Sequence, residues 1–193
     1  LKNKSQFTPF ALNLGIKQAR GDIIMRMDAH SVYEKEYIQK CVQSMQKYDA
    51  DGVGGIWKIV PRENTFIGNI ICLTQANFFG VGNAGYRFGG HQPRWVDTVP
   101  YFCFKKEVFN KIGLFNENLI RGQDLEYNLR LKKSGGKILL VPDIVSYYYI
   151  HSNLKSFLGH NFKNGIWAIL PIKYSKIMPV LPRHLVPFFF VLI

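Results

Sequence analysis

The feature that most constrains the fold is a short apolar run that ends abruptly in polar residues. Residues 23–27 are mostly apolar and are followed at once by Asp28, Ala29 and His30. Such a run is typical of a strand buried in a parallel sheet. Ligands of open α/β sheets bind just beyond the carboxyl ends of their strands. We therefore expect Asp28 and His30 to lie at a ligand site.

Helix and strand patterns alternate around this run. The spacing of apolar residues predicts a helix over 10–20, a helix capped by Ser31 and closed at 51–52, and a strand over 53–60. This alternation predicts an α/β fold with a doubly wound, mainly parallel sheet.

The second half of the chain continues in the same way. Residues 64–79 and 106–112 are predicted to be helical, and residues 121–126 lead into a helix that extends through Leu131. A strand is predicted over 137–141, where Pro142 should stop it, because proline cannot donate a hydrogen bond to the ladder.

A glycine-rich stretch matches the G-x-G-x-x-G pattern at residues 80–85. The dinucleotide-binding fingerprint requires a strand before this pattern and a helix after it. Here the preceding stretch is predicted to be helical, and residues 86–93 are not. We therefore interpret the stretch as a flexible loop, a lid or a wall that faces an acceptor.

The chain is strongly basic, with a formal net charge of +12. A nucleic-acid-binding module would carry clustered lysines, whereas the basic residues here are dispersed. Residues 144–193 contain no Asp or Glu, and their cations stand among aromatic and aliphatic residues. This pattern favours an interfacial segment on anionic lipid, with a surface that merely happens to be basic as the alternative.

The cysteines and several histidines show no pattern of metal ligands. The three cysteines are far apart and stand among apolar residues, which indicates reduced thiols in the core. The cysteines are Cys41, Cys72 and Cys103, and the histidines without a partner at metal-ligand spacing are His91, His151 and His184.

Two charged residues extend the candidate site beyond Asp28. Arg26 shares a strand face with Asp28 by period two, so it either pairs with Asp28 or adds a positive charge for a ligand. Asp124 follows Gly122 at the predicted start of a helix. An acid there is either a partner of the helix dipole or a catalytic group.

Taken in order, these motifs resemble those of family 2 glycosyltransferases, and more narrowly the bacterial enzymes that build exopolysaccharides such as succinoglycan. The resemblance covers most of residues 11–192. Its motifs are Asp28-Ala29-His30, the glycine-rich loop at 80–85, residues 96–100, Gly122-Gln123-Asp124-Leu125-Glu126 and Arg183-His184-Leu185-Val186-Pro187.

The resemblance implies a GT-A fold and a D-x-D-like motif that binds the diphosphate of a nucleotide sugar through a divalent cation. Asp28 corresponds to the first acid of that motif, and His30 replaces the last. Imidazole binds manganese better than magnesium, so we expect Mn²⁺, with Mg²⁺ as the alternative. Arg26 is expected to bind the donor diphosphate together with Asp28 and His30.

On the acceptor side, Asp124 corresponds to the general base of inverting members. Gln123 is expected on the acceptor side, and Glu126 is expected either to shape the acceptor site or to be structural. His160 stands where the family often has Gln, and Trp167 is expected either to stack on a sugar or to anchor the chain in a core or at a membrane interface.

The resulting hypothesis is an inverting hexosyltransferase that moves a sugar from a nucleotide sugar, expected to be a UDP-sugar, to a lipid-linked or polysaccharide acceptor. We expect a catalytic domain over 1–150 and a membrane-proximal segment over 151–193, at the cytoplasmic face of the cell membrane. A strand and a helix are expected before Leu1, and a membrane segment is expected after Ile193. A non-catalytic glycosyltransferase-like subunit and a basic nucleic-acid-binding module remain alternatives.

Overall fold

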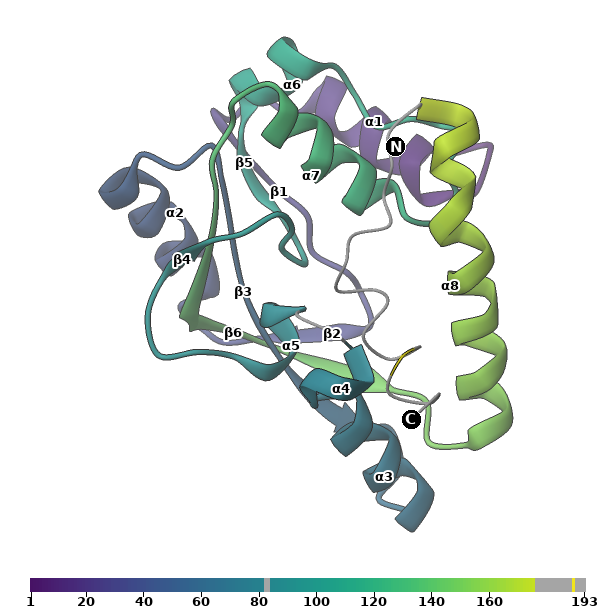
Figure 1. Cartoon of the computed structure of the whole chain (residues 1–193). Helices are drawn as coiled ribbons and strands as arrows, with labels where there is room; N and C mark the ends of the chain where they lie inside the picture. The colour runs from purple at the N-terminus through teal and green to yellow at the C-terminus, as the bar shows by residue number, and fades with distance from the viewer. Residues whose placement is uncertain (82–83, 176–188, 190–193) are drawn as a thin grey trace.

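A mixed six-stranded sheet forms the centre of the computed structural model, which describes residues 1–81, 84–175 and 189 (Figure 1). The strand order is β1-β5-β3-β6-β2, with β4 paired to β6 outside this path. The strands are β1 Ile23–Met25, β2 Ser31–Tyr33, β3 Gly52–Pro61, β4 Arg94–Trp95, β5 Cys103–Lys105 and β6 Ile138–Ile150.

The long central ladder is parallel, and the short strands join it antiparallel. β3 and β6 pair in parallel from Gly52–Ile138 to Pro61–Ile150. The pairs β1–β5, β3–β5, β4–β6 and β2–β6 are antiparallel. The parallel core predicted from the alternating pattern is therefore present, within a mixed sheet.

Helices cover both faces of the sheet. Figure 1 shows α1, α6 and α7 together on one side and α2 on the other. α8 runs along the edge of the molecule and contacts α3. The helices are α1 Thr8–Gln18, α2 Tyr37–Tyr48, α3 Phe66–Gln75, α4 Phe78–Val81, α5 Gly85–Phe88, α6 Lys106–Ile112, α7 Gln123–Lys133 and α8 Leu154–Ser175.

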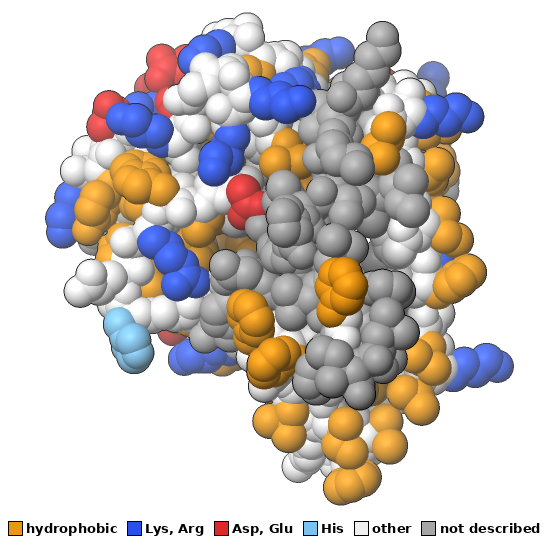
Figure 2. Space-filling model, viewed as in Figure 1, with side chains coloured by type: hydrophobic (Ala, Val, Ile, Leu, Met, Phe, Trp, Pro, Cys, Tyr) orange, Lys and Arg blue, Asp and Glu red, His pale blue; other side chains and the backbone are white. Residues whose placement is uncertain are grey.

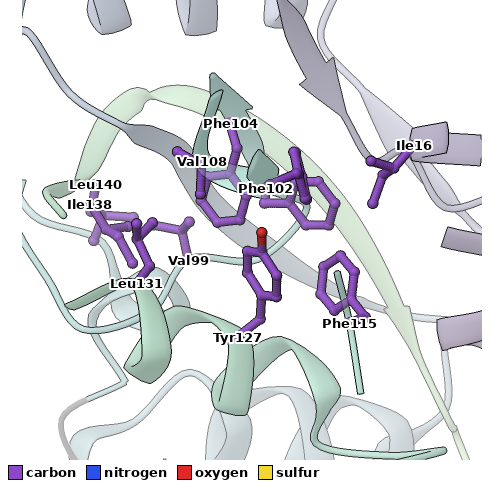
Figure 3. Close-up of a cluster of buried hydrophobic side chains, with 11 residues drawn as sticks. Ile16, Val99, Phe102, Phe104, Val108, Phe115, Tyr127, Leu131, Ile138 and Leu140 are labelled. Carbon is purple, nitrogen blue, oxygen red and sulfur yellow. The ribbon is translucent and has the colours of Figure 1, made fainter. Parts of the chain in front are cut away.

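The period-two alternation of β6 divides the core between these two layers. Ile138 and Leu140 face α7, where the aromatic ring of Tyr127 packs among phenylalanines of β5, α6 and the following loop (Figure 3). Leu139 and Val141 belong to the opposite cluster with α2. α7 and α2 are thereby fixed on opposite faces, and α7 carries Asp124.

The prediction that Pro142 ends the last strand was wrong. β6 continues to Ile150, and the register of the β3–β6 ladder shifts between Gly54 and Ile56. Pro142 lies in this irregular stretch, where its missing N–H removes no regular ladder bond. The longer strand brings Tyr148 toward the candidate site.

The predicted helix cap at Ser31 was also wrong. Ser31 begins β2, which pairs with the second half of β6, and α2 starts only at Tyr37. Pairing with β6 over residues 146–148 therefore overrides the local capping preference of Ser31.

The glycine-rich stretch contains short helices, contrary to the prediction that no helix follows it. α4 ends at Val81 and α5 begins at Gly85, while residues 82–83 lie outside the described part. The element before the stretch is helical, so the strand that a dinucleotide-binding fingerprint requires is absent from this position.

α8 is the last element that the structure describes at length. It has 22 residues. Within the described part of the chain, no helix is both long and apolar enough to cross a membrane. The predictions for residues 177–193, including the 183–187 motif, lie outside the described residues apart from Phe189.

Candidate active site

Arg26 joins the two acids that the sequence placed at the candidate site. Its Nε and Nη2 donate to Asp28 Oδ1 and Oδ2 over 2.7 and 2.9 Å. Its Nη1 donates to both carboxylate oxygens of Asp124, each over 2.7 Å. Asp28 and Asp124 thus meet through one guanidinium, and Arg26 pairs with both of them.

The backbone explains why Arg26 lies in this position. β1 ends at Met25, but the Arg26 N–H still donates to the carbonyl oxygen of Phe102 over 2.9 Å, beside β5. The chain then turns, with Ser31 N–H donating to Asp28 O over 3.2 Å. Arg26 and Asp28 therefore leave the sheet at the carboxyl end of β1.

Asp124 reaches the same point from α7. Gly122 precedes the helix with φ 72° and ψ 5°, a left-handed conformation that glycine adopts without strain. The turn places Asp124 in the first turn of α7, where the helix dipole stabilises a carboxylate. Its side chain is 42% exposed, against 17% for Asp28, so Asp124 keeps a face open to an incoming group.

The charges at the site do not cancel. Burial alone would lower the pKa of Arg26, but the neighbouring charges of Asp124 and Asp28 outweigh burial and raise it above its usual range. One permanent cation between two carboxylates leaves a formal excess of negative charge when both are ionised. Such a site attracts a further cation.

Tyrosines hold the turn that carries Asp28. The backbone N–H of Asp28 donates to Tyr33 Oη over 2.7 Å. Tyr101 packs against the Tyr33 ring at 5.3 Å between centroids, and its hydroxyl is hydrogen-bonded to Ser31 Oγ. Burial raises the pKa of both tyrosines, so they remain neutral hydrogen-bonding groups.

The side chains at the site are of the types that bind a divalent cation. A carboxylate has roughly four lone-pair sites, and the fork from Arg26 uses two of those on Asp28. His30 is exposed, two residues further on. Among the described residues, no group of three or more His, Cys, Asp or Glu side chains could hold a metal. A cation here would need further ligands from a diphosphate and water.

An aromatic surface continues from His30 across the sheet. The His30 ring meets Tyr148 edge-on at 6.3 Å between centroids, and Tyr148 stacks on Trp57 at 4.4 Å with an interplanar angle of 10°. Tyr86 of α5 meets Trp57 edge-on at 5.1 Å. Aromatic faces suit the apolar faces of sugars and bases. We call these three residues, Trp57, Tyr86 and Tyr148, the aromatic wall.

Sequence reasoning missed the aromatic wall. Residues 147–149 are three consecutive tyrosines, which is a visible signal. Strand alternation alone does not say which of them faces the site, because that depends on the register of β6 against β3.

The predicted acceptor-side residues have three different locations. Gln123 is 6% exposed, and its Oε1 has no hydrogen-bond partner among the described residues. Trp167 is half-buried on α8, and a methyl group added at Gly122 would approach its carbonyl oxygen to 3.4 Å. Glu126, by contrast, is 2% exposed and accepts two hydrogen bonds of 3.1 Å from Arg130.

Glu126 therefore does not line an acceptor surface, and that prediction needs correction. Arg130 also donates to the carbonyl oxygens of Ile112 and Leu114, so the ion pair ties α7 to the loop after α6. The role of Glu126 is structural.

A cavity of about 690 Å³ lies at the opposite end of β1 from Asp28. It is lined by Asp22, Ile23, Met45, Gln46, Asp49, Lys105, Lys106, Glu107 and Asn110. None of the predicted site residues belongs to it, so it is separate from the candidate active site.

Comparisons with known proteins agree with this architecture. A crystal structure of S. aureus TarS, residues 1–349, superposes with a TM-score of 0.57 at 14% identity, over 92% of this chain and 49% of that one. A second S. aureus TarS structure superposes with a TM-score of 0.51 at 14% identity, over 86% of this chain and 27% of that one. These similarities support the fold.

Two curated relatives match nearly the whole chain. The Methanococcus voltae dolichyl N-acetyl-alpha-D-glucosaminyl phosphate 3-beta-D-2,3-diacetamido-2,3-dideoxy-beta-D-glucuronosyltransferase is 30% identical over 93% of this chain and 57% of its own length. The Rhizobium meliloti (strain 1021) succinoglycan biosynthesis protein ExoA is 25% identical over 92% of this chain and 58% of its own length. The chain thus spans less than two thirds of either relative.

The profile of Glycosyl transferase family 2 matches residues 9–113, which include Arg26, Asp28 and His30. The chain belongs to glycosyl transferase family 2.

Proposed function

We propose that this chain carries the catalytic site of an inverting hexosyltransferase. The enzyme transfers a sugar from a nucleotide-diphosphate sugar to a saccharide acceptor during synthesis of an exopolysaccharide or cell-surface glycan. One observation carries the proposal: Arg26 donates hydrogen bonds both to Asp28, at the end of β1, and to Asp124, at the start of α7. A donor residue and a general base are then held by one guanidinium.

Asp124 acts as the general base. Its carboxylate accepts the proton of the acceptor hydroxyl while that oxygen forms a bond to the anomeric carbon. The bond between this carbon and the diphosphate oxygen breaks with its electron pair going to the diphosphate. A single in-line displacement of this kind inverts the configuration at the anomeric carbon.

Arg26 keeps this carboxylate oriented. A guanidinium that donates to both carboxylate oxygens fixes the plane of the acid. The same guanidinium is available to the negative charge that grows on the leaving diphosphate. Arg26 therefore acts on both halves of the site.

Asp28 and His30 are the residues that would hold Mn²⁺ or Mg²⁺. A bound divalent cation supplies Lewis-acid stabilisation of the departing diphosphate. The mixed oxygen and nitrogen set favours Mn²⁺ over Mg²⁺. We propose a UDP-sugar as donor.

We further propose that the acceptor is a lipid-linked saccharide or a polysaccharide and that the protein works at the cytoplasmic face of the cell membrane. α8 supports this with a stripe of exposed apolar side chains at every fourth position: Leu154, Leu158, Phe162 and Ile166, exposed by 53, 56, 72 and 47%. α3, which contacts α8, adds the exposed Phe66 and Leu73. Apolar helix faces beside cationic residues bind lipid surfaces.

Figure 2 shows the exposed apolar side chains of α3 and α8 on one face of the molecule. Apolar side chains gather over α3 at the bottom and along α8 at the right, and the acidic side chains visible in this view lie elsewhere. Lys155 and Lys173 of α8 provide charges that match anionic lipid.

The direct test measures nucleotide-diphosphate release from a panel of nucleotide sugars, using the full-length protein with and without Mn²⁺. Asp124→Asn should reduce acceptor-dependent release by at least about a hundredfold, because an amide cannot take up the proton. Asp143→Asn, at an exposed acid of β6, is the matched control and should keep wild-type activity. Full transfer by Asp124→Asn would reject the mechanism. Absence of release from every donor would favour a non-catalytic subunit.

A further inference from the structure

One face of α8 packs directly beside the turn that carries the base. Arg121 Nη1 donates to Asn164 Oδ1 over 3.1 Å. A Cβ atom added at Gly122 would lie 3.4 Å from the Trp167 carbonyl oxygen, so the next helical turn also lies beside this loop. His160, Asn164 and Trp167 are spaced i, i+4 and i+7, which places them on one side of the helix. This side is distinct from the exposed apolar stripe.

Basic side chains from four elements converge around His160. The rings of His151 and His160 lie 5.6 Å apart between centroids. Lys163 and Asn164 are one helical turn from His160, and Arg121 donates to Asn164. Burial lowers the pKa of His160, and the charges of Arg121, His151, Arg87 and Lys163 lower it further. We call these residues, Arg87, Arg121, His151, His160 and Lys163, the α8 basic cluster.

The cluster has no acidic partner in the part of the chain that the structure describes. None of its members takes part in an ion pair there. Like charges held together disfavour the folded state unless a counter-ion is bound. The arrangement is therefore the electrostatic complement of an anion.

The chemistry of the cluster favours a phosphate. Guanidinium groups match phosphate oxygens with paired N–H donors, and lysine adds a point charge. Arg87 is already held by a hydrogen bond to Gln75 and lies over the Trp57 ring, 5.1 Å from its centroid. The cluster thus adjoins the aromatic wall, so a phosphate at the cluster would have a sugar-binding surface beside it.

The members of the cluster come from α5, the turn before α7, the end of β6 and α8, and not from the end of β1. The donor-binding residues Asp28 and His30 belong to the β1 end. Arg121 is three residues from Asp124, which receives the acceptor hydroxyl. The cluster therefore lies beside the proposed base and belongs to other elements than the donor residues. This location favours binding of the acceptor.

We propose that the α8 basic cluster binds the phosphate of a phosphate-linked saccharide acceptor and thereby presents the acceptor sugar to Asp124. This inference rests on the proposed function, whose acceptor class it names. The apolar stripe of the same helix then faces the lipid to which that phosphate is attached.

Binding of soluble probes tests this proposal without turnover. The full-length protein is titrated calorimetrically with decyl phosphate, with neutral decyl glucoside and with inorganic phosphate. We expect decyl phosphate to bind at least tenfold more tightly than decyl glucoside. Arg121→Gln and Lys163→Gln should each weaken decyl phosphate binding by roughly tenfold, as expected for loss of one charged hydrogen bond. Lys133→Gln, at an exposed lysine of α7, removes the same charge elsewhere and should change it less than twofold.

Several results would overturn the proposal. Equal affinity for the charged and neutral probes, or unchanged affinity in both cluster variants, would show that the cluster does not bind phosphate. If the cluster variants bind nucleotide diphosphate more weakly than wild type but bind decyl phosphate normally, the cluster belongs to the donor site. A loss confined to binding of phosphatidylglycerol vesicles would assign it to lipid headgroups. If Arg121→Gln does not fold, Arg121→Lys should still bind decyl phosphate more weakly than wild type.

The outcome is separable from that of the proposed function. Donor hydrolysis in the absence of acceptor reports on Asp28 and Arg26, whereas decyl phosphate binding reports on the α8 basic cluster. A protein that binds decyl phosphate through the cluster but turns over no donor would reject the proposed transferase activity and not the phosphate site.

Discussion

Arg26 and Asp124 are 98 residues apart in the chain, yet Nη1 of Arg26 lies 2.7 Å from both carboxylate oxygens of Asp124. The side chain of Arg26 is only 13% exposed. The same guanidinium holds Asp28, so one residue connects the strand end of the family motif to the helix that carries the proposed base.

Replacing Arg26 by methionine should affect both stability and catalysis. Asp28 and Asp124 would both lose their cationic partner. We expect a loss of roughly 1–3 kcal/mol in the free energy of unfolding, below the range for a fully buried pair because Asp124 is 42% exposed. kcat should fall at least about tenfold as the base loses its orientation. Urea unfolding and steady-state kinetics measure the two effects. Arg20→Met, at an exposed arginine, is the control, and equal behaviour of both variants would contradict the bridging role.

His30→Asp tests whether His30 is a metal ligand. The change restores an all-oxygen pair with Asp28, which hard Mg²⁺ prefers. The ratio of activity in Mg²⁺ to activity in Mn²⁺ should therefore rise several-fold. His91→Asp, at an exposed histidine, is the matched control. An unchanged ratio in His30→Asp would mean that His30 does not contact the metal.

Glu126→Gln separates a structural role from an acceptor role. Glu126 is 2% exposed and pairs with Arg130, so loss of its charge should lower the free energy of unfolding by about 1–3 kcal/mol. The KM for the acceptor should stay within about twofold in the folded enzyme. Glu107→Gln, whose side chain is 73% exposed, should leave stability nearly unchanged. A raised acceptor KM without loss of stability would restore the original expectation for Glu126.

His160 should make the fold less stable in mild acid. Burial, and then the charges of Arg121, His151, Arg87 and Lys163, lower its pKa in the folded state below the ordinary 6.5. The unfolded chain then binds a proton more readily than the folded chain does, so this contribution to stability is present above pH 6.5 and is lost as the pH falls below it.

Thermal unfolding between pH 5.5 and 7.5 measures this effect. His160→Gln should reduce the fall in melting temperature on acidification, while His91→Gln, at a histidine outside the cluster, should not. If His160→Gln and wild type lose the same stability, the α8 basic cluster does not act on His160 as described. Bound decyl phosphate should reduce the fall in wild type, because it neutralises the surrounding cations.

Phe162→Ser tests the membrane-facing stripe of α8. This side chain is 72% exposed, so its replacement should not disturb the core. Burial of one phenylalanine in the interface is worth about 1.5–3 kcal/mol, and binding to anionic vesicles should weaken roughly tenfold or more. Val32→Ser, at a half-exposed residue of β2, is the control for surface hydrophobicity. Equal vesicle binding by wild type and Phe162→Ser would reject the stripe as a lipid contact.

Prediction from sequence succeeded where one local signal decided the structure. The helix over 106–112 was predicted at its observed bounds, because a short apolar pattern ends at Gly113, whose φ of 79° suits glycine. The strand after Asp22 and the placement of Asp28 beyond it were likewise visible in the sequence, since an apolar run changes to polar residues there. The prediction that this strand is buried in the parallel part of the sheet was wrong, because β1 is a half-buried edge strand that pairs antiparallel with β5.

Prediction failed where a distant partner decided the structure. Ser31 can cap a helix, but the pairing of residues 31–33 with residues 146–148 of β6 makes it part of a strand. Pro142 is tolerated because the β3–β6 ladder is irregular beside it. Neither partner can be identified from the residues next to Ser31 or Pro142, because strand register depends on contacts far apart in sequence.

The sequence by itself determined the chemistry of the site: a carboxylate and an imidazole after an apolar strand, and a second carboxylate after a glycine at the start of a helix. Only the tertiary structure decided that Arg26 joins the two acids, that Glu126 turns inward to Arg130, and that basic residues from four elements surround His160. Residue type and local spacing are properties of short segments. These contacts depend on how the sheet and helices pack, which brings together side chains that the chain keeps far apart.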